Sequence, residues 1–268
     1  MFLKRDTKDP LIRLMHDVYN MSPLRPIQER AEVGDLHESD GKRTKKRGRI
    51  NFLLDPPLKM PELIEDEQLP DFDTVSTSSL VFKVGFDWCK DFLSALGIGN
   101  IGAKINANFE KLQAKWMKIR FSNVTRDSVD AYELGYWLED TRLRVKNPFY
   151  NPDFRYYLVT AVARSPSICI KVESKTGKAL SLDLDVLDSL KNATGVVTNF
   201  STKEELIVEG KKLAFGVEYF EMRYDPKLQR LSFIPAGIVR VGNKQKIKLE
   251  PSFIGGPKAD AFVNLETN

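Results

Sequence analysis

The chain has 268 residues, of which 42% are hydrophobic, enough to build an ordinary core in one large domain or two small ones. The net charge is +4, and the two cysteines, Cys89 and Cys169, lack the spacing of a metal site. These features exclude a disordered chain and a small secreted domain held together by disulfides. The charged start, Met1–Arg5, predicts no signal peptide and therefore a cytoplasmic protein.

The first predicted element is a short amphipathic helix. Asp9-Pro10 is an N-cap and first-turn signature, and apolar residues recur at helical spacing from Leu11 to Tyr19. Further on, the dipeptide Asp40-Gly41 is typical of a hairpin turn. We expect it to connect two strands, the second of which includes the apolar run Ile50–Leu54.

The segment from Asp55 to Asp73 changes in composition. Prolines are interleaved along it with glutamates and aspartates. Proline interrupts regular structure, and a dense run of acidic side chains favours exposure to water. We therefore expect an irregular acidic connection that lies outside the core.

Two segments then show the alternation of a strand. Residues 80–88 place apolar side chains on one face, and residues 103–121 resume the alternation after a possible short helix at Cys89–Leu96 and a glycine-rich connection. Adjacent apolar residues at Trp116-Met117 predict a β-bulge. Both segments approach or exceed the roughly 9 to 11 residues of a transmembrane strand, whereas no apolar run is long enough for a transmembrane helix.

A second alternating region covers residues 156–173 and 180–190, with a turn at Lys175–Gly177. Pro166 removes a ladder donor from the first segment, and the aspartates of the second are costly in a membrane unless they face a lumen. Residues 180–190 also fit a helical stripe, so this hairpin is the weaker candidate for membrane insertion.

The late part of the chain returns to strand patterns. Apolar residues alternate from Leu213 toward Tyr224, and Asp225-Pro226 ends the segment. Residues Leu228–Val241 then predict a returning strand.

The residues assemble no catalytic or cofactor site. Gly97–Gly102 match the dinucleotide fingerprint literally, but a strand pattern follows where the fingerprint requires a helix. We interpret these glycines as a small-residue connection between two segments. His16 and His37 have no ligand partner at metal spacing, and no nucleophile elbow is present. The sequence therefore predicts neither an enzyme nor a bound cofactor.

Several short segments resemble the gasdermin family. Asp9–Leu11, Tyr19-Asn20 and Pro23–Arg25 resemble the start of bacterial gasdermins. Other matches resemble gasdermins more widely, namely Asn51–Asp55, Tyr157–Ala161 and Gly210–Val217. About one linker's length remains after Val241, so the chain resembles the bacterial type with a short C-terminal inhibitory peptide. Its first residues contain no cysteine, so the lipid-modified cysteine common in bacterial gasdermins is not predicted.

The resemblance implies an α+β fold with a central twisted, mostly antiparallel sheet and peripheral helices, like the gasdermin N-terminal pore-forming domain. It implies a pore-forming domain at 1–243, a protease-sensitive linker at 244–250 and an autoinhibitory peptide at 251–268. Removal of the peptide by a caspase-like or trypsin-like protease would let copies assemble into β-barrel pores. These pores would kill the host cell during phage infection. The intact monomer would be cytoplasmic, and the cut protein would lie in the inner membrane with its lipids.

Four groups of residues carry these expectations. The linker residues are Lys244, Lys246, Lys248 and Leu249, and the tail anchors are Phe253, Ile254, Phe262, Val263 and Leu265. The lipid-binding basic residues are Lys104, Lys111, Lys115, Lys118 and Arg120. The membrane-inserting residues are Phe82, Val84, Phe86, Trp88, Ile105, Phe109, Trp116, Ile119, Ile168, Ile170 and Val172.

Three alternatives stay open at this point. An ordinary α+β domain with amphipathic strands explains the alternation equally well, and the tail can be an ordinary terminal strand. A second basic cluster could instead bind nucleic acid or a protein partner without any membrane step. Its members are Lys42, Arg43, Lys45, Lys46, Arg47 and Arg49.

Overall fold

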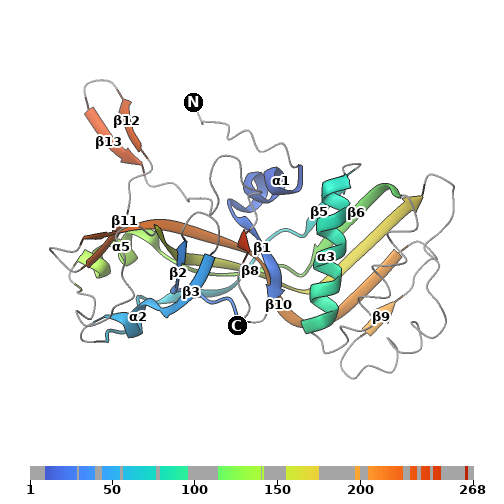
Figure 1. Cartoon of the computed structure of the whole chain (residues 1–268), viewed down its shortest axis with the longest axis horizontal. Helices are drawn as coiled ribbons and strands as arrows, with labels where there is room; N and C mark the ends of the chain where they lie inside the picture. Colours follow the sequence, from blue (N-terminus) through green and yellow to red (C-terminus); the bar gives the residue numbers. More distant parts are fainter. Residues whose placement is uncertain are drawn as a thin grey trace.

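A twelve-stranded sheet forms the body of the protein in the computed structural model (Figure 1). The described residues are 10–28, 30–39, 44–54, 57–76, 79–95, 114–139, 141, 155–174, 197–199, 205–225, 230–233, 237–241, 244–248 and 263–264. The strand pairs of this sheet are antiparallel except for one parallel pair at the C-terminus. Helices pack against the sheet, which confirms the predicted α+β class.

Two long central strands organise the sheet, β8 (Arg155–Ser174) and β10 (Glu205–Asp225). These two strands pair with each other. The edge of β8 that faces away from β10 pairs in succession with β2 (Asp35–Ser39), β7 (Thr125–Val129) and β6 (Ala114–Ser122). These three pair in turn with β3 (Thr44–Arg49), β4 (Leu63–Gln68) and β5 (Phe72–Ser76). The far edge of β10 pairs with β1 (Ser22–Gln28), β9 (Val197–Asn199) and β11 (Arg230–Phe233).

Two further features complete the strand pattern. The two-residue strand β14 (Val263–Asn264) adds to β1 in parallel. Strands β12 (Gly237–Val241) and β13 (Lys244–Lys248) pair only with each other among the described strands, as a separate two-stranded sheet. In Figure 1 this hairpin lies away from the twelve-stranded sheet.

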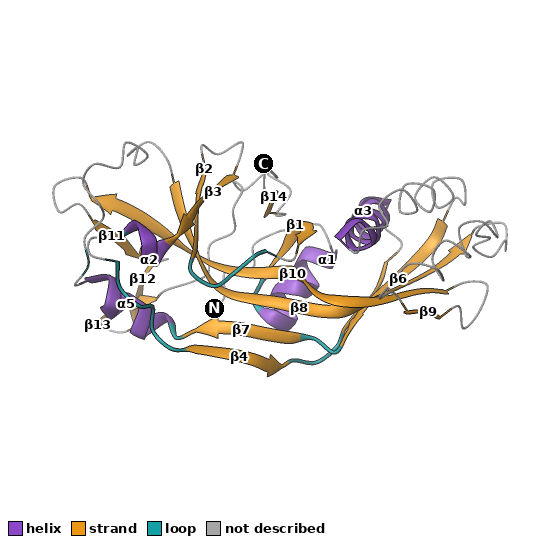
Figure 2. Cartoon of the chain, turned by 90° about the horizontal axis from the view of Figure 1, so that it is seen from below, coloured by secondary structure: helices purple, strands orange, loops and turns teal. Residues whose placement is uncertain are grey.

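The helices are α1 (Pro10–Tyr19), α2 (Ile50–Leu53), α3 (Ser79–Ala95) and α5 (Ala131–Glu139). The start of α5 has the cap that its sequence favours, because the Asp130 carboxylate accepts hydrogen bonds from the backbone N–H groups of Tyr132 and Glu133 at 2.8 and 2.9 Å. Figure 2 shows α3, the longest of these helices, on one face of the sheet.

Several predicted elements are confirmed. The N-terminal helix is α1, the hairpin around Asp40-Gly41 is β2–β3, and the long alternating segments are β8 and β10. The pairing of β6 with β8 is irregular between Ala114 and Trp116, next to the predicted bulge. Pro166 is accommodated because it lies where the neighbour of β8 changes from β6 to β7, and the Ser165 hydroxyl oxygen accepts the Ser167 N–H there at 3.1 Å.

The predicted strand at residues 80–88 is wrong, because this segment lies in α3. Buried residues recur along the helix at Gly85, Trp88, Cys89 and Phe92, which is helical spacing. The segment is so rich in apolar residues that it satisfies the strand period and the helix period together. Packing against the sheet selects the helix.

Three other predictions need correction. The segment 55–73 was expected to be irregular, yet it contains β4 and the start of β5, and Phe72 is only 1% exposed. Most of β4 is exposed, and acidic side chains on an edge strand discourage pairing with other chains.

The apolar run Ile50–Leu54 contributes the short helix α2, whereas the basic stretch before it forms the strand β3. The predicted returning strand, 228–241, is divided between β11 and β12.

Candidate functional site

The functional site begins with the apolar face of the sheet beneath α3. On β6, Met117, Ile119 and Phe121 are fully buried and pair directly with Val172, Ile170 and Ile168 of β8. Directly paired residues share one face of a sheet, so these side chains form one continuous apolar surface. Leu206 and Val208 of β10 extend it, because they pair with Ile170 and Ile168.

Helix α3 lies very close to this apolar face. A β-carbon placed on Gly85 would be 2.4 Å from the Ile119 Cδ1 atom and 2.6 Å from the Met117 sulfur. Such separations are shorter than van der Waals contact, so any side chain at this position would have to displace the ends of Ile119 and Met117. Trp88, one turn further along α3, is fully buried, and its ring centroid lies 5.3 Å from that of Phe121.

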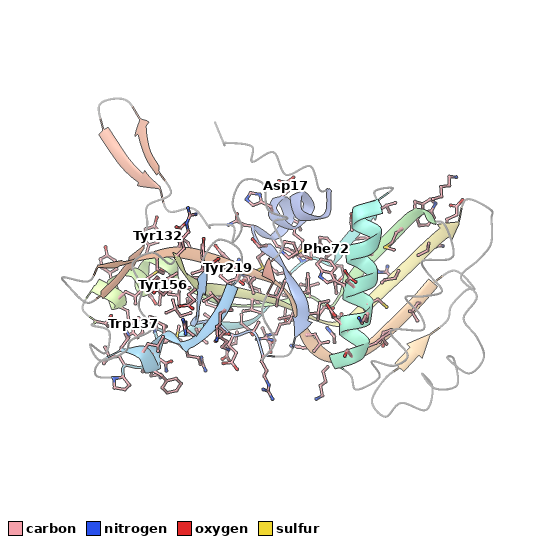
Figure 3. All side chains as sticks on the ribbon, in the orientation of Figure 1. Asp17, Phe72, Tyr132, Trp137, Tyr156 and Tyr219 are labelled. Atoms are coloured by element: carbon pink, nitrogen blue, oxygen red, sulfur yellow. The ribbon has the colours of Figure 1, made fainter. Side chains whose placement is uncertain are left out.

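An aromatic cluster continues from Trp88 through the sheet to α1. Phe121 and Phe215 stack with centroids 4.1 Å apart, and Phe72 lies 6.1 Å from Phe121. Tyr19 of α1 contacts Phe72 at 5.9 Å, and its hydroxyl donates a hydrogen bond to the Pro70 carbonyl oxygen at 2.5 Å. Figure 3 labels Phe72 between α1 and α3. Aromatic residues of the sheet therefore connect α1 with α3.

The opposite face of the sheet at this end is polar. Lys118 forms an ion pair with Asp73 at 2.7 Å, and Lys115 lies 3.6 Å from Glu173. Glu173 also accepts a hydrogen bond from the Trp116 indole, while Arg120 is half-buried. Strands β6 and β8 thus present an apolar face under α3 and a charged face on the other side, the arrangement that a membrane strand between lipid and lumen requires.

The structure brings together only part of the predicted membrane-inserting set. Trp88, Ile119, Ile168, Ile170 and Val172 meet at the interface between α3 and the sheet, whereas Trp116 is half-buried and pairs with Glu173. The helix α3 also carries Phe82, Val84 and Phe86. The membrane-inserting candidates Ile105 and Phe109 and the segment 180–190 lie outside the described residues, as do Lys104 and Lys111 of the predicted lipid-binding basic residues.

The C-terminal tail reaches the sheet at β1. In the parallel pair, Val263 lies beside Leu24 and Asn264 beside Arg25. The predicted anchor Val263 is therefore placed on a strand edge. The other predicted anchors, Phe253, Ile254, Phe262 and Leu265, lie outside the described residues.

The predicted cleavage linker lies mostly in the separate hairpin. Lys244, Lys246 and Lys248 belong to β13, whose partner is β12, and Leu249 lies outside the described residues. The lysines were predicted in an exposed, protease-sensitive linker, and the structure places them in a strand. A hairpin of two strands is marginally stable in water when nothing else supports it.

Three residues of the second basic cluster are paired with carboxylates, whereas Lys42 and Arg43 lie outside the described residues. Lys46 forms an ion pair with Asp35 at 2.7 Å, Arg49 with Glu32 at 3.0 Å, and Arg47 contacts Glu38. These acidic partners come from β2 and the residues before it. These carboxylates offset the positive charge of Lys46, Arg47 and Arg49.

Three buried polar side chains from β2 and β10 lie beside this cluster. Asp35, His37 and Tyr219 are each 1% exposed, and the rings of His37 and Tyr219 meet edge to face at 5.8 Å. Burial and the nearby Lys46 lower the pKa of His37 to about 3, so the imidazole is neutral at pH 7. Burial raises the pKa of Asp35, although Lys46 opposes that effect. Figure 3 labels Tyr219 within the body of the sheet.

Sequence reasoning missed one contact at the site. The indole N–H of Trp88 donates a buried hydrogen bond to the backbone carbonyl oxygen of Leu24 at 3.1 Å. Leu24 lies on an edge strand between two prolines, which signals an irregular strand without indicating its partner.

The described part of the chain shows no alternative site. No group of three or more histidine, cysteine, aspartate or glutamate side chains is placed there to hold a metal ion. None of the described helices combines the length and apolar character needed to cross a membrane.

Comparison with solved structures defines the class of fold. A structure of a bacterial gasdermin from Bradyrhizobium tropiciagri is similar with a TM-score of 0.64, covering 97% of this chain and 98% of that chain at 19% identity. The chain thus has the α+β fold of a bacterial gasdermin. Residues 26–230 match the model of the bacterial gasdermin family, and the chain belongs to that family.

Two relatives extend this finding. Gasdermin bGSDM from a Vitiosangium species is 26% identical over 190 residues, which are 66% of this chain and 70% of the relative. Gasdermin bGSDM from a Desulfuromonadales bacterium is 24% identical over 235 residues, which are 81% and 83% of the two chains. Gasdermins are pore-forming, non-enzymatic proteins, so membership supports a pore-forming function of the gasdermin type.

Proposed function

We propose that the chain is an autoinhibited pore-forming protein that proteolysis of its C-terminal region activates. Family membership carries this proposal, and the amphipathic sheet beneath α3 supports it. In the uncut protein, α3 covers the apolar face of β6, β8 and β10. Departure of α3 would expose this face to lipid, with the charged face opposite it toward a water-filled lumen.

The hairpin β12–β13 is the proposed site of cleavage. It connects the twelve-stranded sheet to the tail, and its two strands pair with each other. Low stability would let it open locally and enter a protease active site. Cleavage by a caspase-like or trypsin-like enzyme would remove the tether that holds β14 at β1. A tethered segment binds at an effective concentration of about millimolar, and this advantage ends when the chain is cut.

Copies of the cut protein would then form a ring in the inner membrane. Strand edges exposed to hydrocarbon leave backbone groups without partners, each at a cost of several kcal/mol, so membrane strands must close into a barrel. A single copy supplies too few strands, and a pore therefore needs many copies. In a bacterium, such pores would kill the cell and thereby limit phage spread.

A liposome assay tests the proposal. The linker at 244–249 is replaced by the recognition sequence of a site-specific protease, and the folded protein is cut in the presence of dye-loaded vesicles. We expect leakage from vesicles with anionic lipid after cutting and none with an inactivated protease. The uncut variant Phe262→Asp, Val263→Asp is expected to leak without cutting. Intact vesicles after complete cleavage would contradict the proposed pore.

A further inference from the structure

The central part of β1 is separated from its neighbour in the sheet. Ser22 and Pro23 pair with Val217 and Gly216 of β10, and pairing resumes only where Gln28 meets Ala214. Five residues of β1 therefore span what takes two on β10, so the segment 24–27 bulges away from the ladder. A segment without ladder hydrogen bonds needs other partners for its backbone groups.

Two partners from distant parts of the chain hold this bulged segment. The tail strand β14 pairs with it at Leu24 and Arg25, and the Trp88 indole of α3 donates to the carbonyl oxygen of Leu24 at 3.1 Å. Leu24 itself is fully buried. Leu24 is thus next to both the tail strand β14 and Trp88 of α3.

Trp88 is also a central contact of α3 with the apolar face. Its ring packs on Phe121, and Gly85 one turn earlier brings the helix backbone against Ile119 and Met117. The indole is completely buried, so its N–H has no access to bulk water. A buried donor that loses its acceptor costs about 1 to 3 kcal/mol. A displacement of Leu24 therefore weakens the docking of α3 directly.

We propose that Trp88 is a positioning residue that couples the C-terminal strand to α3 through the bulged segment of β1. While β14 is paired, Leu24 is held where its carbonyl oxygen accepts the Trp88 indole. When β14 leaves, the segment 24–27 loses one of its two partners, the hydrogen bond weakens and α3 opens more often. The biological role of this coupling rests on the proposed function. The coupling itself is a property of the uncut chain in the absence of a membrane.

Hydrogen exchange of the uncut, full-length chain without lipid tests the coupling. Val263→Pro removes an N–H group and prevents regular pairing of β14. We expect amides of α3 to exchange about fivefold faster, the factor that corresponds to one hydrogen bond of about 1 kcal/mol. Trp88→Phe removes the donor and keeps an aromatic ring against Phe121. In that background, Val263→Pro should accelerate α3 exchange by a clearly smaller factor.

Trp116→Phe is the matched control. Trp116 also donates its indole N–H, but to Glu173 on β8 and away from β1. In this background, Val263→Pro should accelerate α3 exchange as much as in the unmodified chain. Coupling is reciprocal, so Trp88→Phe should also accelerate exchange of the tail peptide containing residues 263–264.

The outcomes that overturn the inference are specific. An equal effect of Val263→Pro with and without the Trp88 indole shows that the indole does not carry the coupling, and no effect on α3 shows that the tail and α3 are independent. If Trp88→Phe does not fold, the variant Trp116→Phe, Trp137→Phe leaves Trp88 as the one fluorophore of its kind. Its emission should shift when Val263→Pro is added, and an unchanged spectrum overturns the coupling. Hydrogen exchange is measured without a membrane, so it tests the coupling alone. A failure of the proposed pore would instead be seen in the liposome assay.

Discussion

At the scale of single residues, Gly85 shows how the sheet and α3 depend on a missing side chain. In most helices, replacing glycine with alanine stabilises by about 1 kcal/mol, because alanine restricts the unfolded chain and favours the helix. Here the added β-carbon would lie 2.4 Å from Ile119 and 2.6 Å from the Met117 sulfur. Both contacts are with the ends of side chains, so the neighbours can adjust only in part within a packed interior.

We predict that Gly85→Ala destabilises the protein by about 1 to 3 kcal/mol, the usual cost of overpacking, instead of stabilising it. Urea unfolding at pH 7 measures the change. Ser94→Ala is the matched control, because Ser94 is exposed near the end of the same helix and experiences only the gain in helix propensity. If Gly85→Ala were as stable as or more stable than the unmodified chain, α3 would not pack as closely as described.

The buried His37 makes stability depend on pH. Its pKa is lowered from 6.5 to about 3 by burial and by Lys46, so the unfolded chain binds a proton that the folded chain refuses. Stability is therefore greatest above pH 6.5 and falls as pH decreases toward 3. Asp35, whose pKa is raised by burial, acts in the opposite direction, because its folded form binds a proton more readily.

We predict that His37→Gln reduces the loss of stability between pH 7 and pH 5 by about 2 kcal/mol, the linkage expected for a shift of this size. Denaturant unfolding of both proteins at the two pH values measures the difference. The comparison isolates the imidazole because Asp35 is common to both proteins. His16→Gln serves as the control, since this side chain is exposed. Equal pH dependence for His37→Gln and the unmodified chain would show that His37 is accessible to protons.

At the scale of elements, the hairpin β12–β13 and the edge strand β14 differ from the rest of the sheet in how little holds them. The central pair β8 and β10 aligns over most of their lengths, whereas β14 contributes two residues and β12–β13 five each. Short elements with few partners open more readily than the core. The segments that we propose to be cut and released are thus among the described strands with little support.

We predict that trypsin at limiting concentration first cuts the native chain between Lys244 and Lys248. Mass spectrometry of the early fragments locates the cut. The triple variant Lys244→Gln, Lys246→Gln, Lys248→Gln should survive several-fold longer at the same enzyme concentration, because opening of the hairpin then presents no basic residue. A first cut inside β8 or β10, or unchanged digestion of the triple variant, would refute local opening of the hairpin.

The elements also show where sequence reasoning succeeds. Alternating apolar residues identified β8 and β10, although residues 156–163 of β8 and 213–217 of β10 are buried on both faces of the sheet. Alternation failed for α3, because residues 80–88 fit the strand period while the buried positions of the segment also recur at helical spacing, and the choice depends on the sheet that the segment packs against. The acidic β4 was missed because charges on an edge strand remove the apolar signal.

At the scale of the whole molecule, the family could be inferred from short matches, while the details of the site could not. The hydrogen bond from Trp88 to Leu24 joins residues 64 positions apart, and the pair of β14 with β1 joins the two ends of the chain. Local patterns contain no information on such distant partners. They arise only when the sheet has brought α3, β1 and the tail together.

The length of the two central strands sets the dimensions of the proposed pore. β8 has 20 residues and β10 has 21, and at about 3.3 Å per residue each would extend roughly 65 to 70 Å if straight. The hydrocarbon layer is only about 30 Å thick. Each strand is therefore about twice as long as the hydrocarbon layer is thick. In the proposed pore, part of each strand would then extend beyond the bilayer as a wall that lengthens the channel.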